Sequence, residues 1–448
     1  MSRIRNVAGK SLLVSLSTLI TLAVLEIGMR IFGFQPTPPE DTLRTYTEYD
    51  PMLGWKGRAA SRGRYNTSEF SIGVALNSGG WRDDEPVEPR GAASGPGSQA
   101  GGGLPGGNAS GAAPQVAVLG DSFAWGYGVE RQERFSDRLE ALLPGWNVQN
   151  YGVCGYGTDQ ELLVLRQSAL KIAPRLVIVE FAIGNDLDNI MSAKAYKLPK
   201  PSFVLAGGAL RLTGVPVPRI ENWERAARTE LRDFLTANLR IYAWVRPRWG
   251  NLQPRILSAL GIAHDTAGDM MRMGPYERNA PKGLERAWEL AEAILGAMRD
   301  DAARAGARLV VLVVPERLQV ENSPWDEVVR GLGVDPARYD RDLPDRRLRE
   351  IADRLGILLV DPLAQQRRLA AQGRALFLPE DPHWNAAGHA VAAEALREAL
   401  APVLDPLVRP SPAPPFGDRA NTPLPPSSRG AAGQSTPVGL GRSGSLPA

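Results

Sequence analysis

Short apolar runs alternate with amphipathic helical stretches between residues 115 and 405, and this alternation constrains the fold more than any other feature. The run Leu-Val-Val-Leu-Val-Val at 309–314 is continuous, as expected of a strand buried on both faces. We expect strands at 116–119, 147–150, 176–181, 309–314 and 357–360, and helices at 135–143, 159–172, 284–305, 345–355 and 386–400. The sequence therefore predicts an α/β fold, a three-layer α/β/α sandwich with a parallel sheet.

An apolar segment near the N-terminus predicts a transmembrane signal anchor. Residues 11–25 carry no charge, but as a helix they cover only roughly 22 Å of a hydrocarbon core of about 30 Å. A helix over residues 7–34 spans the core, with Lys10 at one interface and Glu26 paired with Arg30 on one helix face. Basic residues precede the run, which places the N-terminus in the cytoplasm. The alternatives are a cleaved signal peptide and a buried soluble helix.

Composition divides the chain into segments. Two of them are rich in small residues or proline and poor in large apolar ones, so they cannot bury enough surface to order themselves. We expect a signal anchor at 1–36, an extracytoplasmic leader segment at 37–90, a Gly/Ala-rich flexible loop at 91–114, the α/β domain at 115–409 with an insertion at 187–283, and a Pro/Gly/Ser-rich disordered tail at 410–448. Part of the insertion, residues 221–248, has a helical pattern.

Composition also excludes several kinds of site. Cys154 is the only cysteine, so the chain can form no intrachain disulfide and no cysteine-ligated metal site, and we expect a small buried side chain there. The three histidines (His264, His383 and His389) are too few for a histidine-rich metal site, and we expect a structural role for His389. The 52 Lys and Arg and the 49 Asp and Glu are interspersed, without the basic patch of a nucleic-acid surface.

Polar residues follow the expected strands, at the sheet edge where open α/β folds bind ligands. Ser122 follows the first strand in Gly-Asp-Ser, Gly155 lies in a Gly-rich stretch after the second, and Asn185 follows the third in Gly-Asn-Asp. Asp381 and His383 lie just before the last expected helix. We expect the fold to bring these residues together.

This set of side chains suits acyl transfer. A serine hydroxyl becomes a nucleophile when a base lies within hydrogen-bond reach, and His383 can serve Ser122 as that base. Asp381 can orient the imidazole and stabilise its charged form. The N–H groups of Ser122 and Gly155 and the Asn185 amide can surround an oxyanion, where one donor is typically worth ~2.7–4 kcal/mol.

Structural roles compete with these catalytic ones. In the structural alternative, Ser122 caps a helix N-terminus and has no catalytic role, and His383 is an ordinary surface histidine. Gly152 is the rival of Gly155 as an oxyanion donor. We expect Asp121 to support the nucleophile turn rather than to take part in catalysis.

Together the motifs resemble those of the SGNH, or GDSL-like, hydrolase superfamily. The resemblance covers residues 115–405, and residues 49–90 resemble the leader found in membrane-anchored bacterial members. Four sequence blocks carry it, in the family's order: Gly120-Asp121-Ser122, Asn150 followed by Gly155, Gly184-Asn185-Asp186, and Asp381-x-His383.

The resemblance implies a flavodoxin-like sandwich and a Ser-His-Asp triad without metal or cofactor. One position departs from many GDSL esterases, which have the acid three residues before the histidine, where this chain has Glu380. The spacing of Asp381 is that of relatives acting on exported polysaccharide, so we favour Asp381 and keep Glu380 as the alternative acid.

The expected function is that of a membrane-anchored serine esterase facing the periplasm or cell exterior. Its expected substrates are O-acetyl esters of carbohydrate first and lipid esters second, with no nucleic-acid partner. The alternatives are an O-acyltransferase that moves acetyl groups to an exported polysaccharide, and a non-catalytic domain that binds an envelope component.

Overall fold

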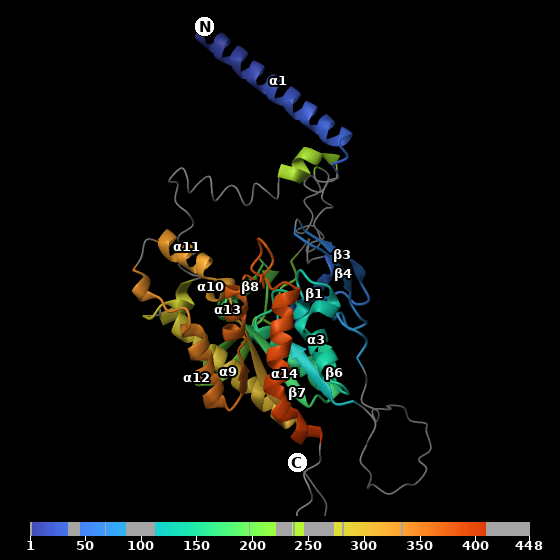
Figure 1. The fold of residues 1–448 in the computed structure, drawn as a ribbon, viewed down its shortest axis with the longest axis vertical. Coiled ribbons are helices and arrows are strands. Elements are labelled where there is room, and N and C mark those ends of the chain that lie inside the picture. The colour runs from blue at the N-terminus through green and yellow to red at the C-terminus, as the bar shows by residue number, and fades with distance from the viewer. Residues whose placement is uncertain are drawn as a thin grey trace, which may run out of the picture. The chain divides into compact units, whose positions relative to one another are not determined.

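The computed structural model describes residues 2–34, 45–67, 69–86, 113–196, 198–220, 235, 238–245, 273–279, 282–332 and 335–408. The expected tail at 410–448, nearly all of the expected flexible loop at 91–114 and most of the helical pattern at 221–248 lie outside these residues. The fold of the described part is shown in Figure 1.

A parallel five-stranded sheet forms the centre of the α/β domain. Its strands are β5 (Gln115–Leu119), β6 (Asn147–Asn150), β7 (Leu176–Ala182), β12 (Arg308–Val314) and β13 (Leu358–Val360). They lie in the order β13-β12-β7-β5-β6, which is the flavodoxin-like order when the strands are counted along the chain. Strand β7 is buried along its whole length, because both of its faces are covered. The predicted strands and the parallel sheet are confirmed.

Helices cover both faces of the sheet, so the domain has three layers (Figure 1). One face carries α4 (Thr158–Gln167), α5 (Asp186–Met191), α9 (Lys282–Arg304) and α12 (Leu343–Leu355). The other carries α3 (Phe135–Leu142), α13 (Leu363–Ala371) and α14 (Ala386–Val408). Helix α9 shows why a helix packs on the sheet. Its apolar residues recur every three or four positions and are buried in the core, as are Ala287, Ala291, Ile294 and Met298.

Further helices and 3-10 turns complete the described residues of the α/β domain. They are the helices α2 (Ser122–Trp125), α10 (Arg317–Val320) and α11 (Asn322–Leu332), and the 3-10 turns η2 (Arg131–Glu133), η3 (Ala169–Ile172), η4 (Gly274–Tyr276) and η5 (Pro336–Arg338).

The helix predicted at 159–172 is interrupted. Helix α4 ends at Gln167, Ser168 has a non-helical backbone, and the 3-10 turn η3 follows. Ala173 then adopts a left-handed conformation with φ of 48° directly before Pro174. The α region is disfavoured for a residue before proline, which is consistent with the end of the helical turns at Ala173.

The leader consists of two antiparallel hairpins that share their core with the α/β domain. Strand β1 (Thr47–Asp50) pairs with β2 (Gly54–Gly57), and β3 (Arg62–Asn66) pairs with β4 (Ser71–Ala75). The indole N–H of the buried Trp55 donates to the carbonyl of Cys154 at 3.2 Å. The side chain of Gln160 on α4 donates to the carbonyl of Leu53 at 2.7 Å. The leader is therefore packed into the domain.

The described part of the insertion contains two small hairpins that the sequence did not predict. Strand β8 (Lys194–Ala195) pairs with β9 (Leu198–Pro199), and β10 (Ser202–Ala206) pairs with β11 (Ala209–Thr213). Lys200 follows the first hairpin and forms a buried ion pair with Asp159 on α4. This ion pair fixes the insertion to the domain beside the second expected motif.

The N-terminal segment forms a single helix, α1 (Ser2–Ile31). The predicted pairing of Glu26 with Arg30 is confirmed by a distance of 2.9 Å between Glu26 Oε1 and Arg30 Nε. None of the helices in the described residues combines the length and hydrophobicity needed to cross a membrane.

Arg82 joins the leader to the loop that follows helix α2. Its side chain is buried, and its guanidinium donates to the carbonyls of Trp125 at the end of α2, of Gly126 and Val129 in that loop, and of Gly73 in the leader, at 2.8–3.1 Å. The guanidinium carbon also lies 4.6 Å from the centre of the Trp125 ring. Burial, together with the charge of a second arginine, lowers its pKa to about 9, so the group keeps its charge at neutral pH.

We expect Arg82→Met to destabilise the chain strongly. The variant leaves four carbonyls without this donor, and each buried group that loses its partner costs about 1–3 kcal/mol. Urea unfolding should show a loss of roughly 3 kcal/mol or more in the free energy of unfolding. Arg62 is exposed in the same leader, and Arg62→Met serves as the control. Equal losses of unfolding free energy in the two variants would contradict the role of Arg82 in joining the leader to the loop.

Candidate active site

The nucleophile turn is built at the carboxyl end of β5. Ser122 is the first residue of α2, and Asp121 caps this helix by accepting the Phe123 N–H at 2.8 Å. Glu180 on β7 accepts the Asp121 N–H at 3.0 Å. A Cβ at Gly120 would lie 2.5 Å from Glu180 Oε2, so only glycine permits this approach. Ser122 is therefore held at the sheet edge where ligands bind.

The fold brings His383 and Asp381 to this serine. Ser122 Oγ lies 2.7 Å from His383 Nε2, although the two residues are 261 positions apart. Asp381 accepts the His383 backbone N–H at 2.9 Å and also bonds to Nδ1 of the ring. Burial opposes ionisation of Asp381, but the hydrogen bond and charge of His383 hold its pKa below the ordinary value. Hydroxyl, imidazole and carboxylate thus form one continuous hydrogen-bonded chain.

Glu380, the alternative acid, is not placed beside the imidazole in this way. It is exposed, and its backbone N–H donates to Glu69 Oε1 of the leader at 2.5 Å. Its side chain lines a pocket with Pro382. The geometry favours Asp381.

Two aromatic rings enclose the His383 imidazole. The Phe123 ring centre lies 4.7 Å from it and the Tyr127 ring centre 4.5 Å, with interplanar angles of 34° and 38°. Tyr127 in turn packs against Phe70 and Tyr65 of the leader. The leader therefore supports the orientation of His383 through Tyr127.

The expected oxyanion donors differ in their availability. The N–H of Gly152 donates to Asn150 Oδ1 at 2.8 Å, so the rival of Gly155 is already engaged. Asn185 Nδ2 donates to Asp121 Oδ2 at 2.6 Å, and because an amide nitrogen carries two hydrogens, one remains for a ligand. Gly155 adopts φ of 82°, which favours glycine. The N–H of Ser122 lies at the start of α2.

Tyr196 packs directly over Gly155. A Cβ at Gly155 would lie 2.1 Å from Tyr196 Cε2, so a larger residue there would displace the ring. Tyr196 has φ of 51°, a rare conformation for an aromatic residue, at the end of the β8–β9 hairpin. Two-residue hairpin connections favour asparagine or glycine in such conformations, so this tyrosine is unusual there.

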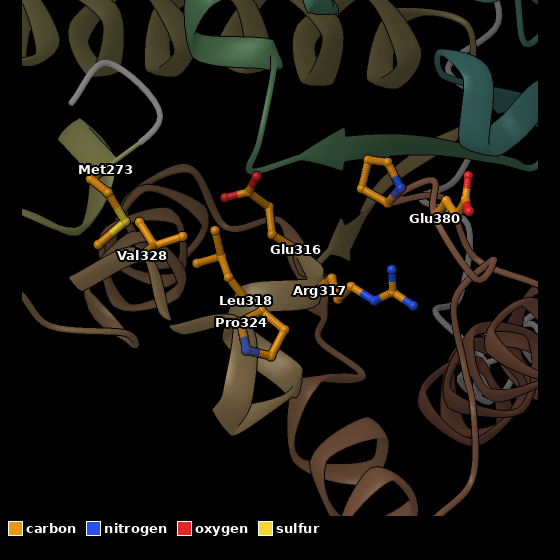
Figure 2. Close-up of a pocket in the computed structure, with 8 residues that line it drawn as sticks. Met273, Glu316, Arg317, Leu318, Pro324, Val328 and Glu380 are labelled. Atoms are coloured by element: carbon orange, nitrogen blue, oxygen red, sulfur yellow. The ribbon is translucent and has the colours of Figure 1, made fainter. Parts of the chain in front are cut away.

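Two neighbouring pockets lie near the Ser122–His383 pair. The smaller, about 140 Å³, is lined by Phe123, Ala182, Gly184, Asn185, Val314, Pro315, Glu316, Pro382 and His383. The larger, about 260 Å³, is drawn in Figure 2. Glu316 and Pro382 line both pockets, so the two pockets are neighbours.

Carboxyl groups are buried behind the nucleophile turn. Glu161 and Glu180 are almost completely buried, and neither oxygen of Glu161 has a hydrogen-bond partner among the described residues. Burial, reinforced by neighbouring carboxyls such as Asp186, raises the pKa of both glutamates well above the ordinary range. Burial thus disfavours the charged form of both groups, and Glu180 supports the Asp121 peptide from behind the turn.

The other polar candidates have structural positions. Cys154 is buried, which raises the pKa of its thiol, and the burial expected for it is confirmed. His389 Nδ1 accepts the Phe135 N–H at 3.3 Å, and burial lowers the pKa of His389 to about 3. In the part of the chain that the structure describes, no three His, Cys, Asp or Glu side chains are grouped to hold a metal ion.

Sequence reasoning missed two residues of the site. Glu316 follows β12 at the sheet edge that carries Ser122 and Asn185, so the rule used for the other strands could have identified it. Tyr196 comes from a hairpin without a distinctive pattern, and its contact with Gly155 follows only from the tertiary fold.

Comparison with known proteins gives one family and several structural similarities. The family model described as the GDSL-like Lipase/Acylhydrolase family matches residues 118–391. No curated protein sequence matches this chain.

Three solved structures illustrate the structural similarities, each covering 64% of this chain. The first is TesA, with 12% identity, coverage of 99% of that chain and a TM-score of 0.32. The second is a lipolytic protein of the G-D-S-L family from Veillonella parvula, with 13% identity, coverage of 97% of that chain and a TM-score of 0.31. The third is a catalytic mutant of an acetylxylan esterase from Geobacillus stearothermophilus, with 14% identity, coverage of 95% of that chain and a TM-score of 0.34.

The match to the family model includes the nucleophile turn, the Gly-Asn-Asp segment and His383, the residues that the fold assembles at one sheet edge. It extends over more than half of the chain. The chain therefore belongs to the GDSL-like lipase/acylhydrolase family and is an ester hydrolase.

Proposed function

We propose that this chain removes short acyl groups, acetyl above all, from extracytoplasmic carbohydrate through a Ser122–His383–Asp381 triad. The observation that carries the proposal is the 2.7 Å contact between Ser122 Oγ and His383 Nε2, with Asp381 on the opposite side of the ring. A base within hydrogen-bond reach is what a serine nucleophile needs.

In the first half of the reaction Ser122 Oγ attacks the ester carbonyl carbon. The hydroxyl proton passes to His383 Nε2, and Asp381 stabilises the imidazolium that forms. Collapse of the tetrahedral intermediate breaks the bond to the alcohol, which leaves with the proton from His383. An acyl group remains on Ser122.

In the second half a water molecule replaces the alcohol. His383 takes a proton from the water, the hydroxide attacks the acyl carbon, and Ser122 Oγ leaves with the proton. The carboxylic acid is released and the triad returns to its starting state. Both tetrahedral intermediates carry an oxyanion, for which the N–H groups of Ser122 and Gly155 and the free hydrogen of the Asn185 amide are the donors.

The small pocket supports the choice of a short acyl group. Its volume of about 140 Å³ is bounded by Phe123, Ala182 and Val314, next to His383 and Asn185. An acetyl group placed there would have its methyl against apolar side chains and its carbonyl oxygen near the Asn185 amide.

Hydrolysis of p-nitrophenyl esters by the full chain tests the triad. We expect turnover that falls as the acyl chain lengthens, and a loss of roughly 10³-fold or more in Ser122→Ala and in Asp381→Asn. Glu380→Gln should cost far less than Asp381→Asn, and the reverse order would make Glu380 the acid. Transfer of the acyl group to an added sugar in excess of hydrolysis would assign the acyltransferase reaction instead.

Gly155→Ala tests the oxyanion donor. The methyl group would force both a strained φ and displacement of the Tyr196 ring, so the N–H should move out of place. We expect kcat to fall about 10²-fold or more, the size of one lost oxyanion donor, with little change in KM. Gly145→Ala is the control, since Gly145 also has a positive φ but has open space around its Cβ position. Equal effects of the two substitutions would contradict the role of Gly155.

The proposal places the α/β domain outside the cytoplasm, held at the cytoplasmic membrane by residues 7–34. Support comes from helix α1, whose apolar side chains Leu16, Ile20, Val24 and Ile27 are exposed, and from the basic residues at its start. The full chain should sediment with membranes and stay there after a salt wash. Recovery of the full chain in the soluble fraction would contradict anchoring.

A further inference from the structure

The turn of the β3–β4 hairpin contacts both loops that carry the catalytic pair. One loop follows Ser122 and contains Tyr127, on which Phe70 of the hairpin packs. The other loop leads to His383, and there Glu69 of the hairpin accepts a backbone N–H. Neither leader residue takes part in the chemical steps above, so their joint contact with the two loops asks for a role of its own.

Hydrogen bonds fix the backbone of this hairpin turn. Thr67 Oγ1 accepts the N–H groups of Glu69 at 3.1 Å and of Phe70 at 3.2 Å, and the Thr67 N–H donates to the Phe70 carbonyl at 2.9 Å. Both carboxylate oxygens of Glu130, in the α/β domain, accept the Gly73 N–H at 3.1 Å. The side chains of the turn therefore start from a backbone that is held in place.

Aromatic contacts lead from the hairpin to the imidazole. The Phe70 ring centre lies 4.9 Å from that of Tyr127 at an interplanar angle of 81°, and the Tyr65 ring centre lies 5.6 Å from both. Edge-to-face pairs of this kind have a preferred geometry, so they orient the Tyr127 ring. The centre of that ring lies 4.5 Å from the centre of the His383 ring. Movement of Phe70 would therefore reach His383 through one intervening ring.

Glu69 contacts the segment that carries the triad acid. Its Oε1 accepts the Glu380 N–H at 2.5 Å, and Glu380 directly precedes Asp381, which bonds to the His383 ring. Arg317 of α10 donates to the two carbonyls that precede Glu380 in the chain, at 2.8 and 3.2 Å. A charged acceptor or donor makes such bonds stronger than neutral pairs. The segment is thus held by the leader as well as by the domain.

Proton transfer depends on the separation of the two loops. A general base must lie about 2.6–3.2 Å from the atom whose proton it takes. The distance from Ser122 Oγ to His383 Nε2 is 2.7 Å, so it lies inside this range. A displacement of about 1 Å can cost about 10²-fold in rate. A single hairpin that contacts both loops opposes such a displacement.

We propose that Phe70 and Glu69 are positioning residues, which hold the nucleophile loop and the His383 loop at the separation that proton transfer needs. Phe70 acts through the Tyr127 ring, and Glu69 acts through the Glu380 peptide. This inference rests on the triad of the proposed function and gives the leader a part in catalysis beyond its packing against the domain.

Steady-state hydrolysis of p-nitrophenyl acetate by the full chain tests the inference. Phe70→Ala should lower kcat about tenfold or more with little change in KM, because proton transfer is impaired while the acyl pocket is intact. Glu69→Ala should lower kcat in the same way. Phe70→Tyr keeps the ring and Glu69→Gln keeps an oxygen acceptor, so these two variants should retain most of the wild-type kcat.

Two comparisons separate positioning from a loss of stability. Val74 is buried on the same hairpin, and Val74→Ala should lower the free energy of unfolding while keeping the wild-type kcat. The second comparison is a double-mutant cycle. If Phe70 acts through Tyr127, Phe70→Ala should cause almost no further loss of kcat in a Tyr127→Ala background.

The outcomes are distinct. A lower kcat in both alanine variants, restored by the conservative variants and absent from Val74→Ala, supports the inference. Wild-type kcat in either alanine variant overturns it, as does a loss in Val74→Ala equal to that in Phe70→Ala. Fully additive losses from Phe70→Ala and Tyr127→Ala also overturn it, while the esterase activity stands. Absence of turnover by the wild-type chain would instead count against the proposed function.

Discussion

The nucleophile loop depends on the hydrogen bonds that the charged guanidinium of Arg82 donates to its carbonyls. The backbone after α2 turns sharply through Gly126 and Gly128, and its carbonyls face a buried region in which each needs a donor. A guanidinium from the leader supplies several of them at once, while Glu180 holds the start of the turn from the sheet. The position of Ser122 is therefore fixed by two segments that lie far from it in the sequence.

The fold could be predicted wherever the sequence carries a long periodic signal. Apart from β6, the core strands are rich in Val, Ile and Leu because both faces are buried, and the strand boundaries differ from expectation by at most one residue. The hairpin β8–β9 gave no such signal, since Lys194–Ala195 and Leu198–Pro199 are too short for alternation to be seen. The hairpin β10–β11 was missed although Gly207-Gly208 separates its two five-residue strands. The interruption at Ser168 was missed because helical periodicity continues across it.

The part of the site that lies after strand ends could be predicted from the sequence. Ser122, Asn185 and the Asp381–His383 segment were expected to meet, and the parallel sheet brings them to one edge. The sequence already favoured Asp381 over Glu380, and the coordinates add the contact of Asp381 with the His383 ring and the engagement of Gly152 by Asn150. The aromatic enclosure of His383 depends on leader residues that no local pattern connects to it.

The buried glutamates behind the turn connect folding to acidity. Unfolding exposes Glu161 and Glu180 to water, where a glutamate has a pKa near 4.3, whereas in the folded chain burial raises their pKa values. At pH values above about 4.3, the folded state therefore holds more protons on these two groups than the unfolded state does. The contribution of the two groups to the free energy of unfolding falls as the pH rises above that value. These two buried carboxyls therefore favour the folded state in acidic rather than in alkaline surroundings.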